Sequence, residues 1–389
     1  MSKTTIHLAV QEIAKKFYNL QHLNVKRLNS YDGLNFLLQT EPENKPDCSQ
    51  KIIEYHILKF VPSDGTLFEL CNKQVELMRH LHHRGFCSPN PVVAANGHYI
   101  WRLNMVEAGL INEMIADLSP PENGFFMVTL LEFIPGRILS SLHPVPYYLF
   151  YEAGQMLARL HELAKTYEGD SQPLKELSNN SYWSLEQAGE VSNYMEVVTD
   201  EELSSIILQV VIRFKENVLP RLSDLPSGII HGDYNDDNII ISSSSEQCIT
   251  PSSSELNDEV NVIDSEPSVR FSITGVIDFS DMSHSYLVFD IAKALSFMVI
   301  TDVPDIMVAV KHFMNGYSSS RELLQVEKDV LISCTMASLA QNIVLALKDY
   351  SINPGNSYLL ASMDDYPVAL KKLFQHTDDE LMTMWNLCQ

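Results

Sequence analysis

Residues 229–241 read Ile-Ile-His-Gly-Asp-Tyr-Asn-Asp-Asp-Asn-Ile-Ile-Ile. Apolar β-forming residues stand at both ends with a polar loop between them, a pattern that predicts strand, loop and strand. The loop carries Asp233 and Asn238. A second apolar stretch, Gly-Val-Ile-Asp-Phe at residues 275–279, places Asp278 at the end of another predicted strand. We therefore expect neighbouring hairpins that present two carboxylates and one amide from their loops.

These three side chains match the parts that phosphoryl transfer needs. In kinases, one carboxylate accepts the proton of the attacking hydroxyl, while an amide and a second carboxylate hold Mg²⁺ on the nucleotide phosphates. The kinase pattern is H-R-D, Asn five residues after the Asp, and a later D-F-G. The spacing is the same here, with Gly232 in place of Arg and Ser280 in place of Gly. The residues predict Asp233 as the catalytic base and Asn238 and Asp278 as Mg²⁺ ligands.

Composition narrows the class of protein further. The 389 residues include 27 Lys and Arg against 50 Asp and Glu, which gives a net charge of −23 and argues against a nucleic-acid partner. The six cysteines have no metal-binding spacing, and His80, His82 and His83 form no ligand pattern. The N-terminus lacks the apolar region of a signal peptide and no apolar run spans a membrane, so we expect a reduced, cytoplasmic protein without membrane contact.

The first third of the chain has the pattern of a nucleotide-binding sheet. An amphipathic helix is expected over Ile6–Leu20, then two strands within Val25–Thr40, joined by a turn that contains Ser30. In a kinase this hairpin covers the phosphates, so Ser30 and nearby backbone N–H groups are candidate phosphate contacts. Lys59, on an alternating strand over 51–61, is the candidate for holding the α- and β-phosphates.

The rest of the chain is predominantly helical. Helices are predicted over residues 66–84, 147–167, 201–222, 303–317, 322–350 and 356–377. Residues 242–271 are rich in serine and scattered acids, a composition that indicates a mobile insertion. Asp281 is either a second metal or network carboxylate or the cap of a turn. Asp290, just before an apolar helix, is expected to cap that helix or to have a buried structural role.

Residues 30–36, 135–137, 231–238 and 278–282 resemble those of the hydroxylysine kinases, in the aminoglycoside phosphotransferase and choline kinase-like superfamily. The resemblance covers nearly the whole chain outside the serine-rich insertion. It implies an α+β, bilobal protein kinase-like fold. The small antiparallel-sheet N-lobe, residues 1–134, would bind the nucleotide, and the mainly helical C-lobe, residues 135–389, would hold the catalytic and substrate-binding groups, with the insertion at 242–271.

The resemblance also implies a reaction. Hydroxylysine kinases transfer the γ-phosphate of GTP, or of ATP, to the hydroxyl of 5-hydroxy-L-lysine, a step of lysine degradation. Glu132 to Ile134 would receive the purine through their main chain. Glu69, and as an open alternative Glu76, would pair with Lys59. Ser280 in place of the usual glycine is compatible with the site if its backbone does not need a positive φ.

Several alternatives remain at this stage. The acceptor could be another amino alcohol such as choline, homoserine or an aminoglycoside. A nucleotide-binding pseudokinase is a second class, but the presence of Lys59, Asp233, Asn238 and Asp278 argues against it. A protein-substrate kinase fits poorly because residues 278–292 contain no A-P-E segment. No obligate protein partner is evident.

Overall fold

The computed structural model describes residues 3–28, 33–40, 53–63, 67–104, 125–243, 260–261, 270–301, 303–354, 360 and 362–388. These residues form two compact units. The first contains residues 1–83 and 88–134, and the second contains residues 84–87 and 135–389. Ser30 and most of the serine-rich stretch lie outside the described residues.

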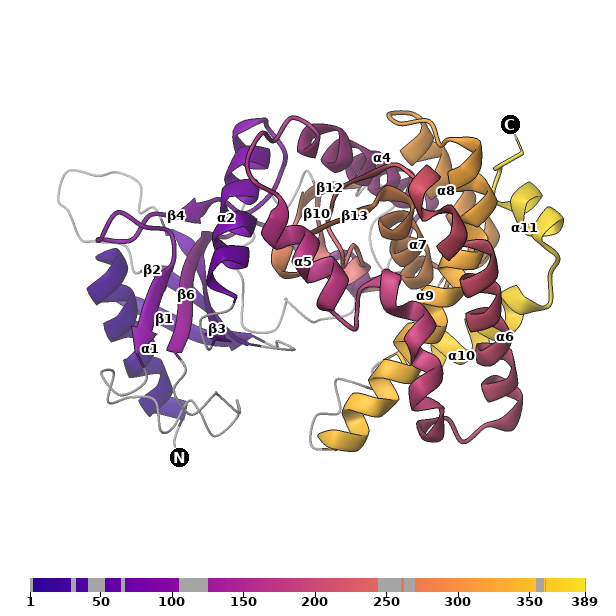
Figure 1. The fold of residues 1–389 in the computed structure, drawn as a ribbon. Coiled ribbons are helices and arrows are strands. Elements are labelled where there is room, and N and C mark those ends of the chain that lie inside the picture. Colours follow the sequence, from indigo (N-terminus) through magenta and orange to yellow (C-terminus); the bar gives the residue numbers. More distant parts are fainter. Residues whose placement is uncertain are drawn as a thin grey trace. The chain divides into compact units, whose positions relative to one another are not determined.

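The first unit is an antiparallel sheet with two helices. Its strands follow the order β1-β2-β3-β6-β4, and β5 also pairs with β6. The helices are α1 (Lys3–Tyr18) and α2 (Phe68–His83), and the strands are β1 (Leu23–Leu28), β2 (Leu34–Thr40), β3 (Tyr55–Ser63), β4 (Pro91–Val92), β5 (Trp101–Asn104) and β6 (Phe125–Glu132). The small antiparallel sheet expected from the sequence is confirmed (Figure 1).

One apolar cluster holds α1 against this sheet. Val10, Ile13 and Phe17 recur at helical spacing, so they lie on one face of α1. They pack with alternate residues of the central strands, such as Phe36 of β2 and Leu58 of β3, all 4% exposed or less. Alternation places these strand residues on one face of the sheet, and burial of that face fixes the strand register.

The second unit is mainly helical, as expected. Its helices are α4 (Tyr147–Ala164), α5 (Gln172–Asn180), α6 (Glu201–Asn217), α7 (Leu287–Met298), α8 (Ile306–Ser318), α9 (Gln325–Ile352), α10 (Asp365–Phe374) and α11 (Asp378–Met384) (Figure 1). Helix α9 has the length and apolar composition of a membrane span, yet 83% of its most apolar window is buried inside the protein. It contacts α6, α7 and α10, so it is the core helix of this unit.

Short strands in the second unit carry the predicted catalytic segments. They are β7 (Arg137–Ile138), β8 (Leu142–His143), β9 (Ser227–Ile230), β10 (Ile239–Ser243), β11 (Val260–Asn261), β12 (Phe271–Val276) and β13 (Ser283–Tyr286). Strand β10 lies between β12 and β7, β9 pairs with β13, and β11 pairs in parallel with β8. The strand–loop–strand pattern predicted for residues 229–241 is therefore present as β9, a loop and β10.

Candidate active site

The register of the β10–β12 hairpin brings the two predicted motifs together. Ile239 pairs with Val276, and the backbone N–H of Ile277 donates to the carbonyl of Asn238 at 2.9 Å. Asp278 follows directly after Ile277, so it lies beside Asn238 although the two are far apart in sequence. Asp233 is joined to Asn238 within the loop. The structure thus gathers the three side chains that the sequence assigns to phosphoryl transfer.

Two amides orient the Asp233 carboxylate. Its Oδ1 accepts from Asn235 Nδ2 at 3.0 Å, and its Oδ2 accepts from Asn238 Nδ2 at 2.9 Å. Burial raises the pKa of the Asp233 carboxyl, and repulsion by Asp278 adds to the rise, whereas the Lys293 ammonium opposes both. A fixed carboxylate with a raised pKa has the geometry and basicity of a proton acceptor.

Asn238 and Asp278 offer oxygen atoms suited to a divalent cation. Because Asn238 uses its Nδ2 on Asp233, its Oδ1 is the atom left to act as a ligand. Carboxylate and amide oxygens suit Mg²⁺, which usually takes its remaining ligands from water and phosphates. Within the described part of the chain, no three His, Cys, Asp or Glu side chains form a metal cage. The donor set therefore fits a Mg²⁺ ion shared with a nucleotide.

Asp278 adopts a left-handed backbone conformation with φ at 58°, which Asp tolerates better than most residues. The Ser280 hydroxyl donates to Asp278 Oδ1 at 2.6 Å. Ser280 itself is not among the described non-glycine residues with positive φ, so its side chain meets no backbone strain. Serine at this position adds a hydrogen bond to the predicted metal ligand that glycine could not make.

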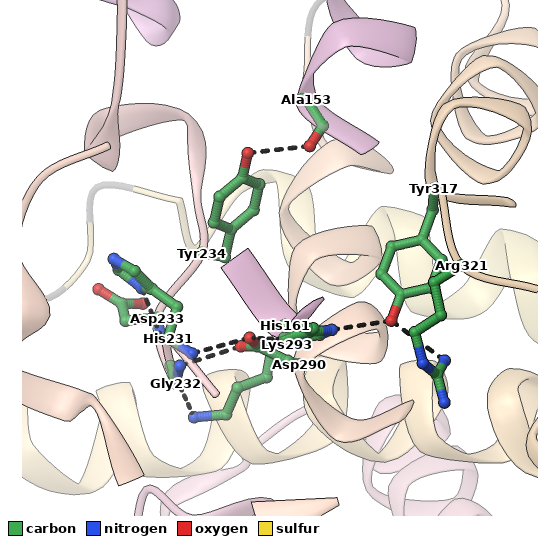
Figure 2. Close-up of polar contacts among 10 residues, drawn as sticks. All are labelled: Ala153, His161, His231, Gly232, Asp233, Tyr234, Asp290, Lys293, Tyr317 and Arg321. Atoms are coloured by element: carbon green, nitrogen blue, oxygen red, sulfur yellow. Dashed lines mark hydrogen bonds and ion pairs between the residues drawn. The ribbon is translucent and has the colours of Figure 1, made fainter. Parts of the chain in front are cut away.

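A buried carboxylate from α7 holds the start of the catalytic loop. Asp290 Oδ2 accepts from the backbone N–H of His231 at 2.8 Å, and Oδ1 accepts from that of Gly232 at 2.9 Å (Figure 2). Burial alone would raise the pKa of Asp290, but hydrogen bonding and charge from His161 keep it below the ordinary value. The sequence predicts Asp290 to be a helix cap or a buried structural residue. The cap is wrong, because the N-cap of α7 is Tyr286, and the buried role is confirmed.

Asp290 is itself held by a chain of buried polar groups. His161 of α4 contacts Asp290 Oδ2 through Nε2 at 2.9 Å and the Tyr317 hydroxyl through Nδ1 at 2.8 Å (Figure 2). Arg321 donates to that hydroxyl at 3.1 Å and makes a bidentate pair with Glu327 at 2.9 Å. The catalytic loop is thereby tied to four helices, α4, α7, α8 and α9, and to the α8–α9 connection, which limits its movement.

His231 and Gly232 are shaped by close packing. His231 accepts the Asp233 N–H at Nδ1 and lies 3.0 Å from the Ile277 carbonyl through Nε2, a geometry that fits the neutral ring. Burial lowers the pKa of His231 in agreement with this. Gly232 has φ at 84°, and a Cβ there would lie 2.2 Å from the Asp281 carbonyl oxygen. Only glycine fits this position without displacing backbone.

Lys293 brings a positive charge to the carboxylates. Its Nζ donates to the Gly232 carbonyl at 2.7 Å, and it lies within electrostatic reach of both Asp233 and Asp281. Asp281 is exposed at the surface, yet nearby protein atoms raise its pKa to about 6, with a further rise from Asp233. Asp281 therefore belongs to the carboxylate network, one of the roles left open by the sequence.

A small cavity adjoins Gly232, Asp281 and Lys293, with Trp183 and Glu186 on its other walls. It holds about 20 Å³, which is room for a water molecule but not for an acceptor.

Lys293 and His161 were missed by sequence reasoning. Asp290 and Lys293 lie three residues apart at the start of an apolar helix, so they share one face. Charged residues on the buried face of an apolar helix are rare unless they are paired. The presence of Asp290 and Lys293 in this helix could therefore have indicated a buried polar contact.

The first unit contains the residues that are predicted to contact the nucleotide. Lys59 lies on β3, pairs with Thr129 of β6, and is within electrostatic reach of the Cys71 thiol. Among the described residues, Glu69 forms no hydrogen bond or ion pair, so the expected Lys59–Glu69 pair is not formed in this structure. Glu76 accepts from Lys73 at 2.8 Å.

The segment expected to receive the purine, Glu132 to Ile134, begins at the last residue of β6. The backbone N–H of Glu132 donates to Asn90 at 2.9 Å, so this donor is already used. The main-chain groups of Ile134 form no hydrogen bond with the described residues, and both Glu132 and Ile134 stay predictions.

Comparison with known proteins agrees with this geometry. Residues 25–250 match the model of the phosphotransferase enzyme family. The chain is 26% identical to a hydroxylysine kinase of Xenopus laevis over 351 residues, which cover 90% of this chain and 84% of the relative. An amicoumacin kinase solved with AMP-PNP and Ca²⁺ superposes with a TM-score of 0.63 at 15% identity, over 98% of this chain and 100% of that one. A microcompartment-associated aminopropanol kinase gives a TM-score of 0.63 at 16% identity, over 97% and 98%.

The kinase-like fold expected from the sequence is therefore confirmed. The chain belongs to the phosphotransferase enzyme family, as a small-molecule kinase that transfers phosphate to an alcohol group.

Proposed function

We propose that this enzyme transfers the γ-phosphate of GTP, or of ATP, to the hydroxyl of 5-hydroxy-L-lysine. The observation that carries the proposal is the assembly of Asp233, Asn238 and Asp278 in one loop cluster, in a chain similar over most of its length to a hydroxylysine kinase. The resemblance to hydroxylysine kinases supports a place in lysine degradation, and the cysteine content and the N-terminal sequence support a cytoplasmic location.

In this mechanism Asp233 accepts the proton of the acceptor hydroxyl while that oxygen attacks the γ-phosphate. Asn235 and Asn238 hold the carboxylate in place, and the anchored backbone of His231 and Gly232 fixes the loop. Asn238 Oδ1 and Asp278 would hold Mg²⁺, which when bound neutralises charge on the phosphates. No covalent enzyme intermediate is required, since positioning and electrostatics supply the catalysis.

The remaining contacts with the nucleotide are assigned to the first unit. Lys59 would hold the α- and β-phosphates, and the main chain of Ile134, with Glu132 beside it, would receive the purine. Ser30 remains a predicted phosphate contact, and Glu69 a predicted support of Lys59 that would have to form its pair on nucleotide binding.

An acceptor panel tests the function. Nucleotide consumption is measured with Mg²⁺ and GTP or ATP against 5-hydroxylysine, choline, homoserine and kanamycin. We expect turnover with 5-hydroxylysine, faster with GTP. Turnover with homoserine or choline instead would keep the mechanism and replace the acceptor. Nucleotide binding without turnover of any acceptor would favour a pseudokinase.

The Asp233→Asn variant tests the base. We expect a loss of turnover of about 10²–10⁴-fold with unchanged nucleotide affinity, because the proton acceptor is removed while the nucleotide ligands remain. Turnover within a few-fold of the wild-type rate would exclude Asp233 as the base.

A further inference from the structure

Glu186 lies outside the catalytic loop, in the first turn of the 3₁₀ segment Leu185–Val197 that follows α5. Its carboxylate is surrounded by serine hydroxyls. Those of Ser184 and Ser285 donate to Oε2 and Oε1 respectively, and that of Ser178 lies 3.4 Å from Oε1. Ser178 belongs to α5 and Ser285 to β13, so tertiary contacts fix the position of this carboxylate.

Glu186 and these three serines line the small cavity that reaches Gly232. Because the groups around the carboxylate all line this cavity, the carboxylate itself lies at its wall. The cavity holds about 20 Å³ and is not closed, so it admits one group of the size of a water molecule. Gly232 directly precedes the proposed base, so the cavity begins next to the residue that must meet the acceptor hydroxyl.

The Glu186 carboxylate is left without a counter-ion. Among the residues that the structure describes, no Lys, Arg or His forms an ion pair with it. Hydroxyl donors stabilise an ionised carboxyl but do not neutralise it. Asp281 and Lys293 also line the cavity, and Lys293 donates to the Gly232 carbonyl at 2.7 Å (Figure 2). These two charges are opposite in sign, so the charge that remains for an incoming cation is that of Glu186.

An aromatic side chain adds to the wall that Glu186 forms. Trp183 lines the cavity, and its ring packs against Tyr182 with 5.7 Å between centroids. The buried Gln341 of α9 donates to the carbonyls of Tyr182 and Ser184, both at 2.9 Å, which fixes the backbone on either side of Trp183. A fixed carboxylate beside an aromatic ring suits an organic ammonium group, which is attracted by charge and by the ring face.

The proposed acceptor carries such groups. 5-Hydroxylysine has one ammonium on the carbon next to the hydroxyl and another three carbons away. Each is about the size of a water molecule, so it fits the cavity while the rest of the acceptor stays outside. We propose that Glu186 and Trp183 bind an ammonium group of the acceptor and thereby select amino alcohols. This inference rests on the proposed function and deepens it, because it assigns acceptor recognition to residues outside the catalytic loop.

A cycle of enzyme variants and acceptor analogues tests the assignment in the full-length protein. One analogue, 2-amino-5-hydroxyhexanoic acid, lacks the ammonium next to the hydroxyl, and the other, 6-amino-5-hydroxyhexanoic acid, lacks the distant one. With wild type, we expect removal of the bound ammonium to lower kcat/KM by about tenfold to a hundredfold relative to 5-hydroxylysine, mainly through KM, because a charged hydrogen bond is lost.

Glu186→Gln keeps the shape of the side chain and removes its charge. We expect this variant to reduce the loss to within about threefold for one of the two analogues, which identifies the ammonium that is bound. Glu190→Gln, at an exposed carboxylate of the same segment, is the matched control and should keep the wild-type losses.

Three results would overturn the inference. One is a loss that is the same in wild type and Glu186→Gln for both analogues, including a complete absence of turnover of both. Another is a folded Glu186→Gln that is inactive on all three acceptors, because Glu186 would then act on the site as a whole. If Glu186→Gln does not fold, the cycle is measured with Trp183→Leu, and unchanged losses for both analogues are the third such result.

Failure of the proposed function gives a different outcome. Wild-type enzyme that phosphorylates homoserine and not hydroxylysine refutes the proposed acceptor, and the cycle is then run with homoserine and 4-hydroxybutanoic acid. Turnover of hydroxylysine with the same losses in wild type and Glu186→Gln refutes only the assignment of Glu186. Wild-type enzyme that phosphorylates no acceptor with an amine overturns both proposals.

Discussion

Replacement of Asp290 by asparagine tests the anchor of the catalytic loop. The carboxylate receives three buried donors, from His231, Gly232 and His161, at 2.8–2.9 Å. The donors are divided between its two oxygens, so an amide in its place must turn an NH₂ group toward at least one N–H. Hydrogen bonds to charged groups contribute about 1.5–3 kcal/mol each, and the substitution loses at least one and weakens the rest. We expect a destabilisation of about 3 kcal/mol.

For a unit of this size, such a loss lowers Tm by roughly 6–12 °C. Thermal unfolding followed by circular dichroism measures the shift, and Asp224→Asn, an exposed carboxylate in the same unit, is the control. We also expect kcat/KM to fall about tenfold to a hundredfold, since the loop that carries Asp233 loses its fixed backbone. A Tm within 2 °C of wild type together with kcat/KM within twofold would show that Asp290 does not hold the loop.

The pH dependence has a definite sign. The pKa of Asp290 is lower in the folded protein than its ordinary value, so its stabilisation is present above the unfolded pKa of about 3.9 and is lost as pH falls through the folded value. The Tm difference between wild type and Asp290→Asn should therefore be largest near neutral pH and shrink at acid pH. A difference that grows on acidification would contradict the assignment of an ionised Asp290.

Three further changes give distinct readouts. Arg321→Met leaves the Glu327 carboxylate buried without its bidentate partner, and we expect a loss of about 3–5 kcal/mol, seen as a lower Tm with little change in KM. Gly232→Ala forces a Cβ against the Asp281 carbonyl at positive φ, so we expect kcat to fall at least tenfold in a kinetic assay of whatever protein folds. Asp278→Ala should abolish Mg²⁺-dependent nucleotide binding in calorimetry, and unchanged binding would exclude it as a metal ligand.

The catalytic hairpins were predictable because their signals are local. Apolar residues on both sides of residues 231–238 indicate two strands, and the structure has β9 and β10 there. Asp233 and Asn238 lie five residues apart in one short loop. Their contact could therefore be predicted once that loop was recognised as a turn. The pairing of β10 with β12 was also expected, because successive strands usually lie side by side.

Helix ends were less predictable. A helix was expected over residues 356–377, whereas α10 covers Asp365–Phe374 and a separate helix, α11, begins at Asp378. Thr377 is the N-cap of α11 and makes a capping box with Glu380. That Thr-x-x-Glu signal was present in the sequence, but the predicted helix ended at residue 377 and no helix was predicted after it.

The buried network around Asp290 could not be read from the sequence. His161 and Asp290 are 129 residues apart, and Asp290 and His231 are 59 apart. Their contacts arise from the packing of α4 and α7 beside β9, which no local pattern specifies. The preference for Glu69 over Glu76 as the partner of Lys59 rested on a resemblance to relatives of the family, and it stays a prediction.

The active site combines a surplus of negative charge with a place for an incoming cation. Asp278 raises the pKa of both Asp233 and Asp281, and Asp233 raises that of Asp281, whereas Lys293 lowers both. A Mg²⁺ ion at Asn238 and Asp278 would remove the repulsion on one side of the base. Because that cation would enter with the nucleotide, the repulsion on Asp233 would be relieved when the nucleotide binds, beside the phosphate that the acceptor hydroxyl must attack.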